Sequence, residues 1–140
     1  MFKMNALTDN DFSNALKDAS QAGVKIRLNV RGTCCLIPGI KGITDNVEIR
    51  SVVSRFLEHG RIYIFGKGDQ QKIYIASADL MTRNTERRME IGVPIEDAEL
   101  KRILFNYVDL YMKDNTKARR LTADGTYVKV TVKKDEDKVD

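Results

Sequence analysis

A strict alternation of apolar and polar residues from Val24 to Arg31 most constrains the fold of this chain. The stretch reads Val-Lys-Ile-Arg-Leu-Asn-Val-Arg, so its four aliphatic residues share one face of an extended chain. Arg27 and Arg31 fall on the opposite face. The pattern therefore predicts a β-strand in a sheet with one apolar face.

Two segments with helical periodicity flank a strand-rich middle. In the first, residues 9–22, Thr8 and Asp11 form a variant of the capping box and Gly23 is a typical helix stop. The second, residues 96–112, has acidic residues in its first turn and apolar residues at helical spacing.

Further β-rich stretches are a strand over 47–53, a hairpin of 61–65 with 72–76, a strand over 89–93, and a hairpin of 118–121 with 127–133. The sequence leaves open whether residues 54–59 are helical or extended. Residues 32–46 predict a long irregular loop, which its apolar Cys34-Cys35-Leu36-Ile37 run keeps packed and ordered. The chain therefore predicts an α/β domain over residues 1–133, with a mixed β-sheet flanked by helices, and a charged tail over 134–140 that frays.

Composition narrows the class of protein. A chain of 140 residues can bury enough surface to fold as one domain without a metal or disulfide. The two cysteines are adjacent, which disfavours a bridge and matches no zinc spacing, so we expect a reducing, cytoplasmic setting. No apolar run approaches the ~20 residues of a membrane helix, and the first residues are too polar for a signal peptide. We therefore expect no membrane span.

Positive charge is concentrated around the single histidine, His59. Segment 50–88 contains eight basic and four acidic residues, which accounts for the whole formal net charge of +4. This distribution favours an anionic partner near His59, although a solvated basic face would show the same pattern.

His59 and Arg31 are the candidate chemical residues. A histidine can exchange a proton near neutral pH, but a lone histidine is often a packed or capping residue. Arg31 ends a strand before Gly32, where a guanidinium can contact a phosphate, or pair with a carboxylate at the surface.

Other motifs favour structural roles. The adjacent thiols of Cys34 and Cys35 could suggest redox chemistry, but neighbours in an extended chain point to opposite faces, so we interpret both as small core side chains. The Gly66-Lys67-Gly68-Asp69 segment lacks the spacing of a phosphate-binding loop and predicts a hairpin turn. Tyrosines in the first hairpin could stack nucleic-acid bases or pack in the sheet. The sequence contains no cluster of metal-ligating side chains, so it predicts no metal site.

Five blocks of sequence resemble the C-terminal part of bacterial polyphosphate kinase, in the order of that family. They are Lys3-Met4-Asn5-Ala6-Leu7, Ala22-Gly23-Val24-Lys25-Ile26, the 30–39 segment Val-Arg-Gly-Thr-Cys-Cys-Leu-Ile-Pro-Gly, the 50–59 segment Arg-Ser-Val-Val-Ser-Arg-Phe-Leu-Glu-His, and the 75–84 segment Ile-Ala-Ser-Ala-Asp-Leu-Met-Thr-Arg-Asn. Together they extend over nearly the whole chain.

The resemblance implies a phospholipase D-like domain, the second of two in the family's catalytic core. The implied enzyme reversibly transfers the terminal phosphoryl of ATP to polyphosphate through a phosphohistidine. The phosphorylated histidine, the Mg²⁺ ligands and the aromatic residue that stacks on adenine belong to family regions outside this chain. Expected partners are ATP or ADP, polyphosphate, the remaining domains and, in the intact enzyme, further copies, but not nucleic acid. The intact enzyme is expected in the cytoplasm, with peripheral attachment to the inner membrane left open.

The resemblance gives two residues a role. Arg31 corresponds to a family arginine that contacts the nucleotide phosphates, and His59 to the second active-site histidine. An arginine can neutralise charge on the transferring phosphoryl oxygens, and a histidine can bind phosphate or supply a proton. Further candidate phosphate contacts are Arg61, Arg83, Asn84 and Arg88.

The chain departs from the usual phospholipase D pattern. The expected His-x-Lys reads His59-Gly60-Arg61, and Gly66 stands at the spacing of the usual aspartate. No carboxylate is therefore predicted to orient the imidazole, which argues against a hydrolytic phosphodiesterase. Two alternatives stay open, a non-catalytic polyanion or nucleic-acid binding module and one half of a phospholipase D-like phosphodiesterase.

Overall fold

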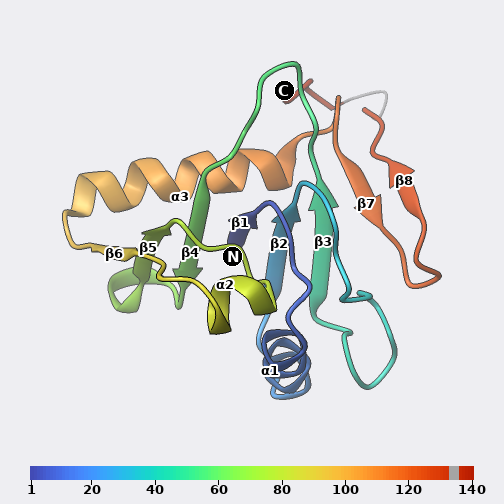
Figure 1. The fold of residues 1–140 in the computed structure, drawn as a ribbon. Coiled ribbons are helices and arrows are strands. Elements are labelled where there is room, and N and C mark those ends of the chain that lie inside the picture. The colour runs from blue at the N-terminus through green and yellow to red at the C-terminus, as the bar shows by residue number, and fades with distance from the viewer. Residues whose placement is uncertain (133–135) are drawn as a thin grey trace.

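A single mixed β-sheet of eight strands organises the chain (Figure 1). The computed structural model describes residues 1–132 and 136–140. The strands are β1 (Phe2–Met4), β2 (Ile26–Val30), β3 (Val47–Ser51), β4 (Arg61–Phe65), β5 (Lys72–Ala76), β6 (Gly92–Ile95), β7 (Arg119–Leu121) and β8 (Tyr127–Lys129). They lie in the order β6-β5-β4-β1-β2-β3-β7-β8. The β1–β2 and β2–β3 pairs are parallel and the other pairs are antiparallel, so the predicted mixed α/β architecture is confirmed.

Three α-helices accompany the sheet within the described residues: α1 (Asn10–Gln21), α2 (Thr82–Glu86) and α3 (Ala98–Lys113). The N-cap of α1 is Asp9 rather than the predicted Thr8, because the Asp9 carboxylate accepts a hydrogen bond from the Phe12 N–H at 3.0 Å. The sequence did not predict α2, which is short and has no apolar face of its own.

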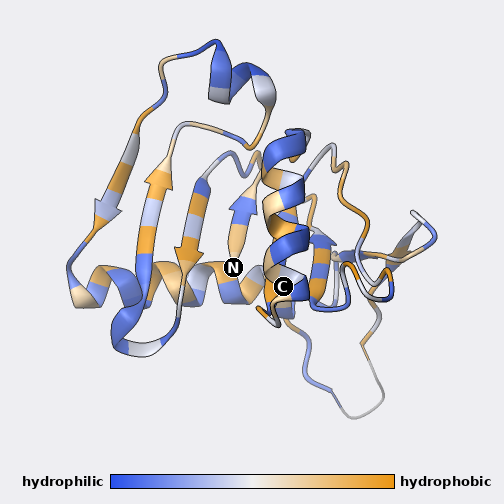
Figure 2. Cartoon of the chain, turned by 90° about the horizontal axis from the view of Figure 1, so that it is seen from below, coloured by the Kyte–Doolittle hydropathy of each residue, from blue (hydrophilic) through white to orange (hydrophobic). Residues whose placement is uncertain are grey.

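Apolar side chains form two clusters, one with each long helix. Leu16 of α1 packs with residues of β1, β2 and β3, among them Leu28 and Ile49, both fully buried. Val108 of α3 packs with Ile62 and neighbouring isoleucines of β4 and β5. The helix α3 runs across the strands in Figure 1, and Figure 2 shows the alternation of apolar and polar residues along the strands. Burial of both faces fixes the strand register, because a slip by one residue would exchange the two faces.

The strand β1 occupies the centre of the sheet, between β4 and β2, although the sequence did not predict it. Its three residues are all buried, including the polar Lys3, so they show no alternation. Its position depends on pairing with strands far away in the chain.

Several other predicted boundaries agree with the structure, but the strand predicted over 89–93 is wrong in its bounds, since β6 begins at Gly92 and includes Pro94. Both hairpins form, and residues 32–46 contain no helix or strand yet bury Leu36 and Thr44. Residues 54–59 adopt neither a helix nor a strand. The predicted boundary between domain and tail falls at residues 133–135, which lie outside the described residues. The tail was expected to fray, but Val139 exchanges two hydrogen bonds with Asn115, at 2.8 and 3.1 Å.

No helix in the described part of the chain is long and apolar enough to span a membrane.

Candidate functional site

Strand order brings Arg31 and His59 to the same end of the sheet. The parallel strands β1 and β2 end side by side, so Asn5, which follows β1, lies beside Arg31, which follows β2. The strand β4 runs antiparallel to β1, so the residues that precede β4, including His59, reach the same edge. Segments distant in sequence therefore meet at the ends of three adjacent strands.

Arg31 is held by the segment that follows β1. Its Nε donates a hydrogen bond to Asn5 Oδ1 at 3.1 Å, and its backbone N–H donates to the Met4 carbonyl at 3.1 Å. Gly32 N–H donates to the Asn5 carbonyl at 2.8 Å. None of the described residues accepts a hydrogen bond from the terminal nitrogens of Arg31, so these nitrogens are available for a ligand.

His59 is exposed, and its ring lies against a second guanidinium. Arg61 Nη2 lies 3.0 Å from His59 Nε2, and Arg61 Nη1 donates to the His59 carbonyl at 3.0 Å. Because a guanidinium only donates hydrogen bonds, Nε2 must be the acceptor and the ring proton resides on Nδ1. In this arrangement Nδ1–H is the donor that the ring can offer to a ligand.

The buried carboxylate of Asp79 holds the Arg61 guanidinium in place. Asp79 is buried and its Oδ2 accepts a hydrogen bond from Arg61 Nη2 at 2.9 Å, while its Oδ1 accepts from the Asn5 N–H at 2.7 Å. Burial by itself would raise the pKa of the Asp79 carboxyl, but the hydrogen bonds and positive charge from Arg61 and the Asn5 N–H outweigh burial and lower it.

Among the described residues no carboxylate contacts the His59 ring, in agreement with the sequence, and the ring contact is the Arg61 guanidinium that Asp79 holds. Gly66 lies in the β4–β5 hairpin, as its sequence predicts, but Asp79 reaches His59 indirectly through Arg61. The signal that could have found Asp79 is its place in a block that resembles the family.

A buried lysine holds the chain on both sides of His59. Lys3 is only 2% exposed, and its Nζ donates to the carbonyls of Glu58 at 3.3 Å and Gly60 at 3.1 Å. The ammonium lies 5.0 Å from the centre of the Tyr111 ring, at a distance typical of a cation–π contact. Burial lowers the pKa of Lys3, and its neighbours Arg31 and Arg61 lower it further. Lys3 was missed as a site residue because its alignment with His59 depends on the β1–β4 pairing.

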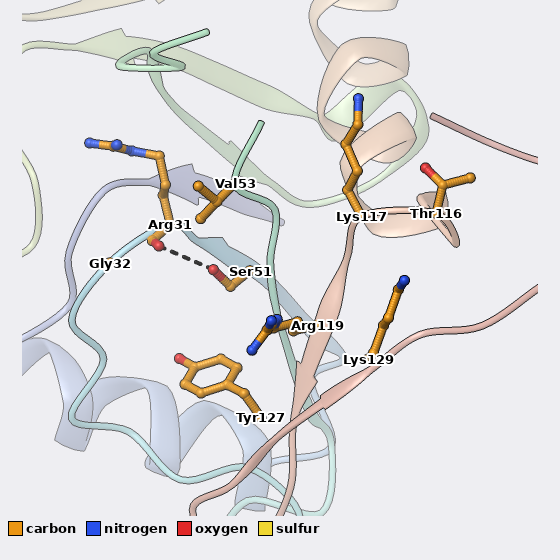
Figure 3. A pocket seen from close by; sticks show the side chains of 9 residues that line it. All are labelled: Arg31, Gly32, Ser51, Val53, Thr116, Lys117, Arg119, Tyr127 and Lys129. Carbon is orange, nitrogen blue, oxygen red and sulfur yellow. Dashed lines mark hydrogen bonds between the residues drawn. The ribbon is translucent and has the colours of Figure 1, made fainter. Parts of the chain in front are cut away.

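A cavity of about 630 Å³ opens next to Arg31 (Figure 3). It is lined by Arg31, Gly32, Ser51, Val53, Thr116, Lys117, Arg119, Tyr127 and Lys129. Its other basic residues are Lys117, just before β7, and Arg119 and Lys129 of the second hairpin. The sequence did not connect either segment with the site. Among the sequence-predicted site residues that the structure describes, Arg31 lines this cavity and His59 does not.

The remaining candidates differ in their accessibility. Arg83 and Arg88 are exposed. Asn84 is buried and its amide donates to Glu90 Oε1 at 2.6 Å, so this donor already has a partner within the chain. The tyrosine of β4, Tyr63, packs edge to face on Phe2 with ring centres 5.2 Å apart, which favours a structural role over base stacking.

In the part of the chain that the structure describes, no three His, Cys, Asp or Glu side chains come together.

Comparison with known proteins identifies the family. A family model described as Polyphosphate kinase C-terminal domain 2 matches residues 1–140. The chain belongs to this family.

Similar proteins agree with the assignment. The chain is 51% identical over 127 residues to a polyphosphate kinase from Staphylococcus epidermidis, covering 91% of this chain and 17% of the relative. It is 47% identical over 131 residues to a polyphosphate kinase from Pseudomonas aeruginosa, covering 94% of this chain and 19% of the relative. The solved structure of polyphosphate kinase from Porphyromonas gingivalis matches with a TM-score of 0.94 and 36% identity, over 99% of this chain and 21% of that chain.

Three conclusions follow from these matches. The polyphosphate kinase fold, which the resemblance implied to be phospholipase D-like, is the fold of this domain. The chain spans less than a fifth of the length of the two curated relatives. The alternatives of a nucleic-acid module and a phosphodiesterase half are not favoured by the matches.

Proposed function

We propose that this domain supplies the second, phosphate-holding half of a polyphosphate kinase active site. The complete enzyme reversibly transfers the terminal phosphoryl of ATP to polyphosphate through a phosphohistidine on another domain. The observation that supports this proposal is that Arg31 and His59 both contact the side chain of Asn5, Arg31 through its Nε at 3.1 Å and His59 through its carbonyl at 3.4 Å.

In this proposal Arg31 contacts the phosphates of the nucleotide. Its Nε is engaged by Asn5, which leaves the two terminal nitrogens of a planar fork for phosphate oxygens. Positive charge fixed in advance stabilises the negative charge that spreads over the phosphoryl oxygens during transfer.

His59 donates a hydrogen bond to a phosphate oxygen. In the arrangement seen, Nδ1–H is the available donor of the ring, since Nε2 faces Arg61. Arg61 adds a second positive charge at the same place, and Asp79 keeps it there through the 2.9 Å ion pair.

The cavity beside Arg31 gives the polyphosphate chain a basic surface. Lys117, Arg119 and Lys129 line this cavity together with Arg31 (Figure 3). Polyphosphate has about one negative charge per residue and is attracted to such a surface. The proposal also places the Mg²⁺ of the intact enzyme on ligands from its other domains, and the protein, with free thiols, in the cytoplasm.

Substitution in a full-length polyphosphate kinase that contains this domain tests the proposal. We expect Arg31→Ala and His59→Ala each to lower the rate of phosphoryl transfer about 100-fold or more, as removal of a single stabilising donor or proton donor does. The matched control is Arg102→Ala, an exposed arginine on α3. Near-normal transfer in both site variants would overturn the proposal.

A further inference from the structure

We propose that Asn5 is a positioning residue that holds the guanidinium of Arg31 and the chain at His59 in a fixed relation to one another. The inference rests on the proposed function, because the relative placement of Arg31 and His59 affects the reaction only if both bind phosphate. Asn5 itself lies under the site and is 7% exposed, so it acts through its neighbours.

Both ends of the Asn5 amide are occupied by groups of the site. Its Oδ1 accepts from Arg31 Nε at 3.1 Å, and its Nδ2 donates to Asp79 Oδ1 at 3.2 Å and to the His59 carbonyl at 3.4 Å. Arg31 can only donate, whereas the Asp79 carboxylate and the His59 carbonyl can only accept. The chemistry therefore requires this orientation of the amide, with oxygen toward Arg31 and nitrogen toward Asp79.

The backbone of Asn5 is fixed as firmly as its side chain. Its N–H donates to Asp79 Oδ1 at 2.7 Å, and its carbonyl accepts from the Gly32 N–H at 2.8 Å. A Cβ at Gly32 would lie 3.0 Å from that carbonyl oxygen, so the absence of a side chain there allows the close approach. Asn5 is thus attached to the ends of β1 and β2 and to Asp79.

An amide is suited to this place because it combines a donor and an acceptor in one short planar group. An aspartate at position 5 would set an oxygen against the Asp79 carboxylate and the His59 carbonyl. An alanine would leave Arg31 Nε without a partner and free the guanidinium to turn. If the ligand must order the guanidinium, the ligand binds more weakly and the transfer step is slower than when the guanidinium is already in place.

The experiment uses a full-length polyphosphate kinase that contains this domain and measures kcat and KM for ATP at saturating polyphosphate. Asn5→Ala introduces no charge and keeps the backbone bond to Asp79, and we expect kcat/KM to fall about tenfold. Asn14→Ala is the matched control, since Asn14 is exposed on α1, and it should leave kcat/KM unchanged. Thermal unfolding of every variant shows whether the fold persists.

A double-mutant cycle separates positioning from general destabilisation. If Asn5 acts through Arg31, then Asn5→Ala made in the Arg31→Ala background should lower kcat/KM by less than about threefold further. A further tenfold loss would show that Asn5 does not act through Arg31 and would overturn the positioning of Arg31 by Asn5. The inference would also be overturned if Asn5→Ala had the kcat/KM of the wild type while Arg31→Ala was slow. That result would leave the proposed function intact.

A second variant avoids any change at Asn5. Arg31→Lys keeps the positive charge but removes the Nε–H that Asn5 holds, and we expect at least a tenfold loss of kcat/KM. A rate equal to wild type would overturn the positioning role even if Asn5→Ala fails to fold. Normal transfer in both Arg31→Ala and His59→Ala would instead reject the proposed function.

Discussion

Replacement of Asp79 by asparagine tests whether the ion pair beneath His59 holds the site together. The two side chains have nearly the same shape, so the variant Asp79→Asn removes the charge with little change in packing. The Asp79 and Arg61 side chains are only 8% and 15% exposed, and their atoms lie 2.9 Å apart. Breaking a buried pair costs about 3–5 kcal/mol, because it leaves one charge without compensation.

The lower end of this range applies, since the Arg61 guanidinium also donates to the His59 carbonyl and reaches solvent. We therefore expect the free energy of unfolding at pH 7 to fall by about 3 kcal/mol. In a domain of this size that corresponds to a lowering of Tm by about 10 °C. Urea unfolding followed by circular dichroism measures the difference, and Asp18→Asn, at an exposed position of α1, is the control.

The same variant has a defined pH dependence. Because the pKa of Asp79 is lowered in the folded state, its contribution is fully present above the ordinary pKa of about 3.9 and is lost as the pH falls through the lowered value. The stability difference between wild type and Asp79→Asn should therefore shrink below about pH 4. A loss under about 1 kcal/mol at pH 7, or a difference that stays constant down to pH 3, would refute the reasoning.

Three further predictions concern the surroundings of the site. Lys3→Met keeps a buried apolar side chain but removes the ammonium that donates to the carbonyls of Glu58 and Gly60. Backbone amide hydrogen exchange around His59 should therefore accelerate at least tenfold, and unchanged exchange would contradict the contacts described. Gly32→Ala places a Cβ 3.0 Å from the Asn5 carbonyl oxygen, so the backbone beside Arg31 must shift. The affinity for ATP, measured by calorimetry, should weaken about tenfold, and an unchanged affinity would show that the backbone adjusts without disturbing the site. The interpretation of both thiols as core side chains is wrong for Cys35, which is exposed, whereas burial raises the pKa of the Cys34 thiol to about 11. A disulfide reagent at pH 8 should therefore modify Cys35 at least ten times faster than Cys34, and equal rates would argue against burial of Cys34.

Local sequence signals predicted the elements that depend on short-range order. The alternation over 24–31 gave β2, the turn residues of the hairpins gave β4 with β5 and β7 with β8, and helical periodicity gave α1 and α3. Helix periodicity and turn chemistry act within a few residues, so they are visible without the fold. The site residues Arg31 and His59 came from a resemblance and not from any local rule.

The chain by itself determined an α/β domain with positive charge gathered around one histidine. Only the tertiary structure set the three-residue β1 at the centre of the sheet, and with it the positions of Lys3 and Asn5 beneath the site. Asp79 lies 20 residues beyond His59, and Lys3 lies 55 residues before Glu58, so no short-range pattern relates them. Their contacts follow from strand order, which the burial of two apolar faces selects over the whole chain at once.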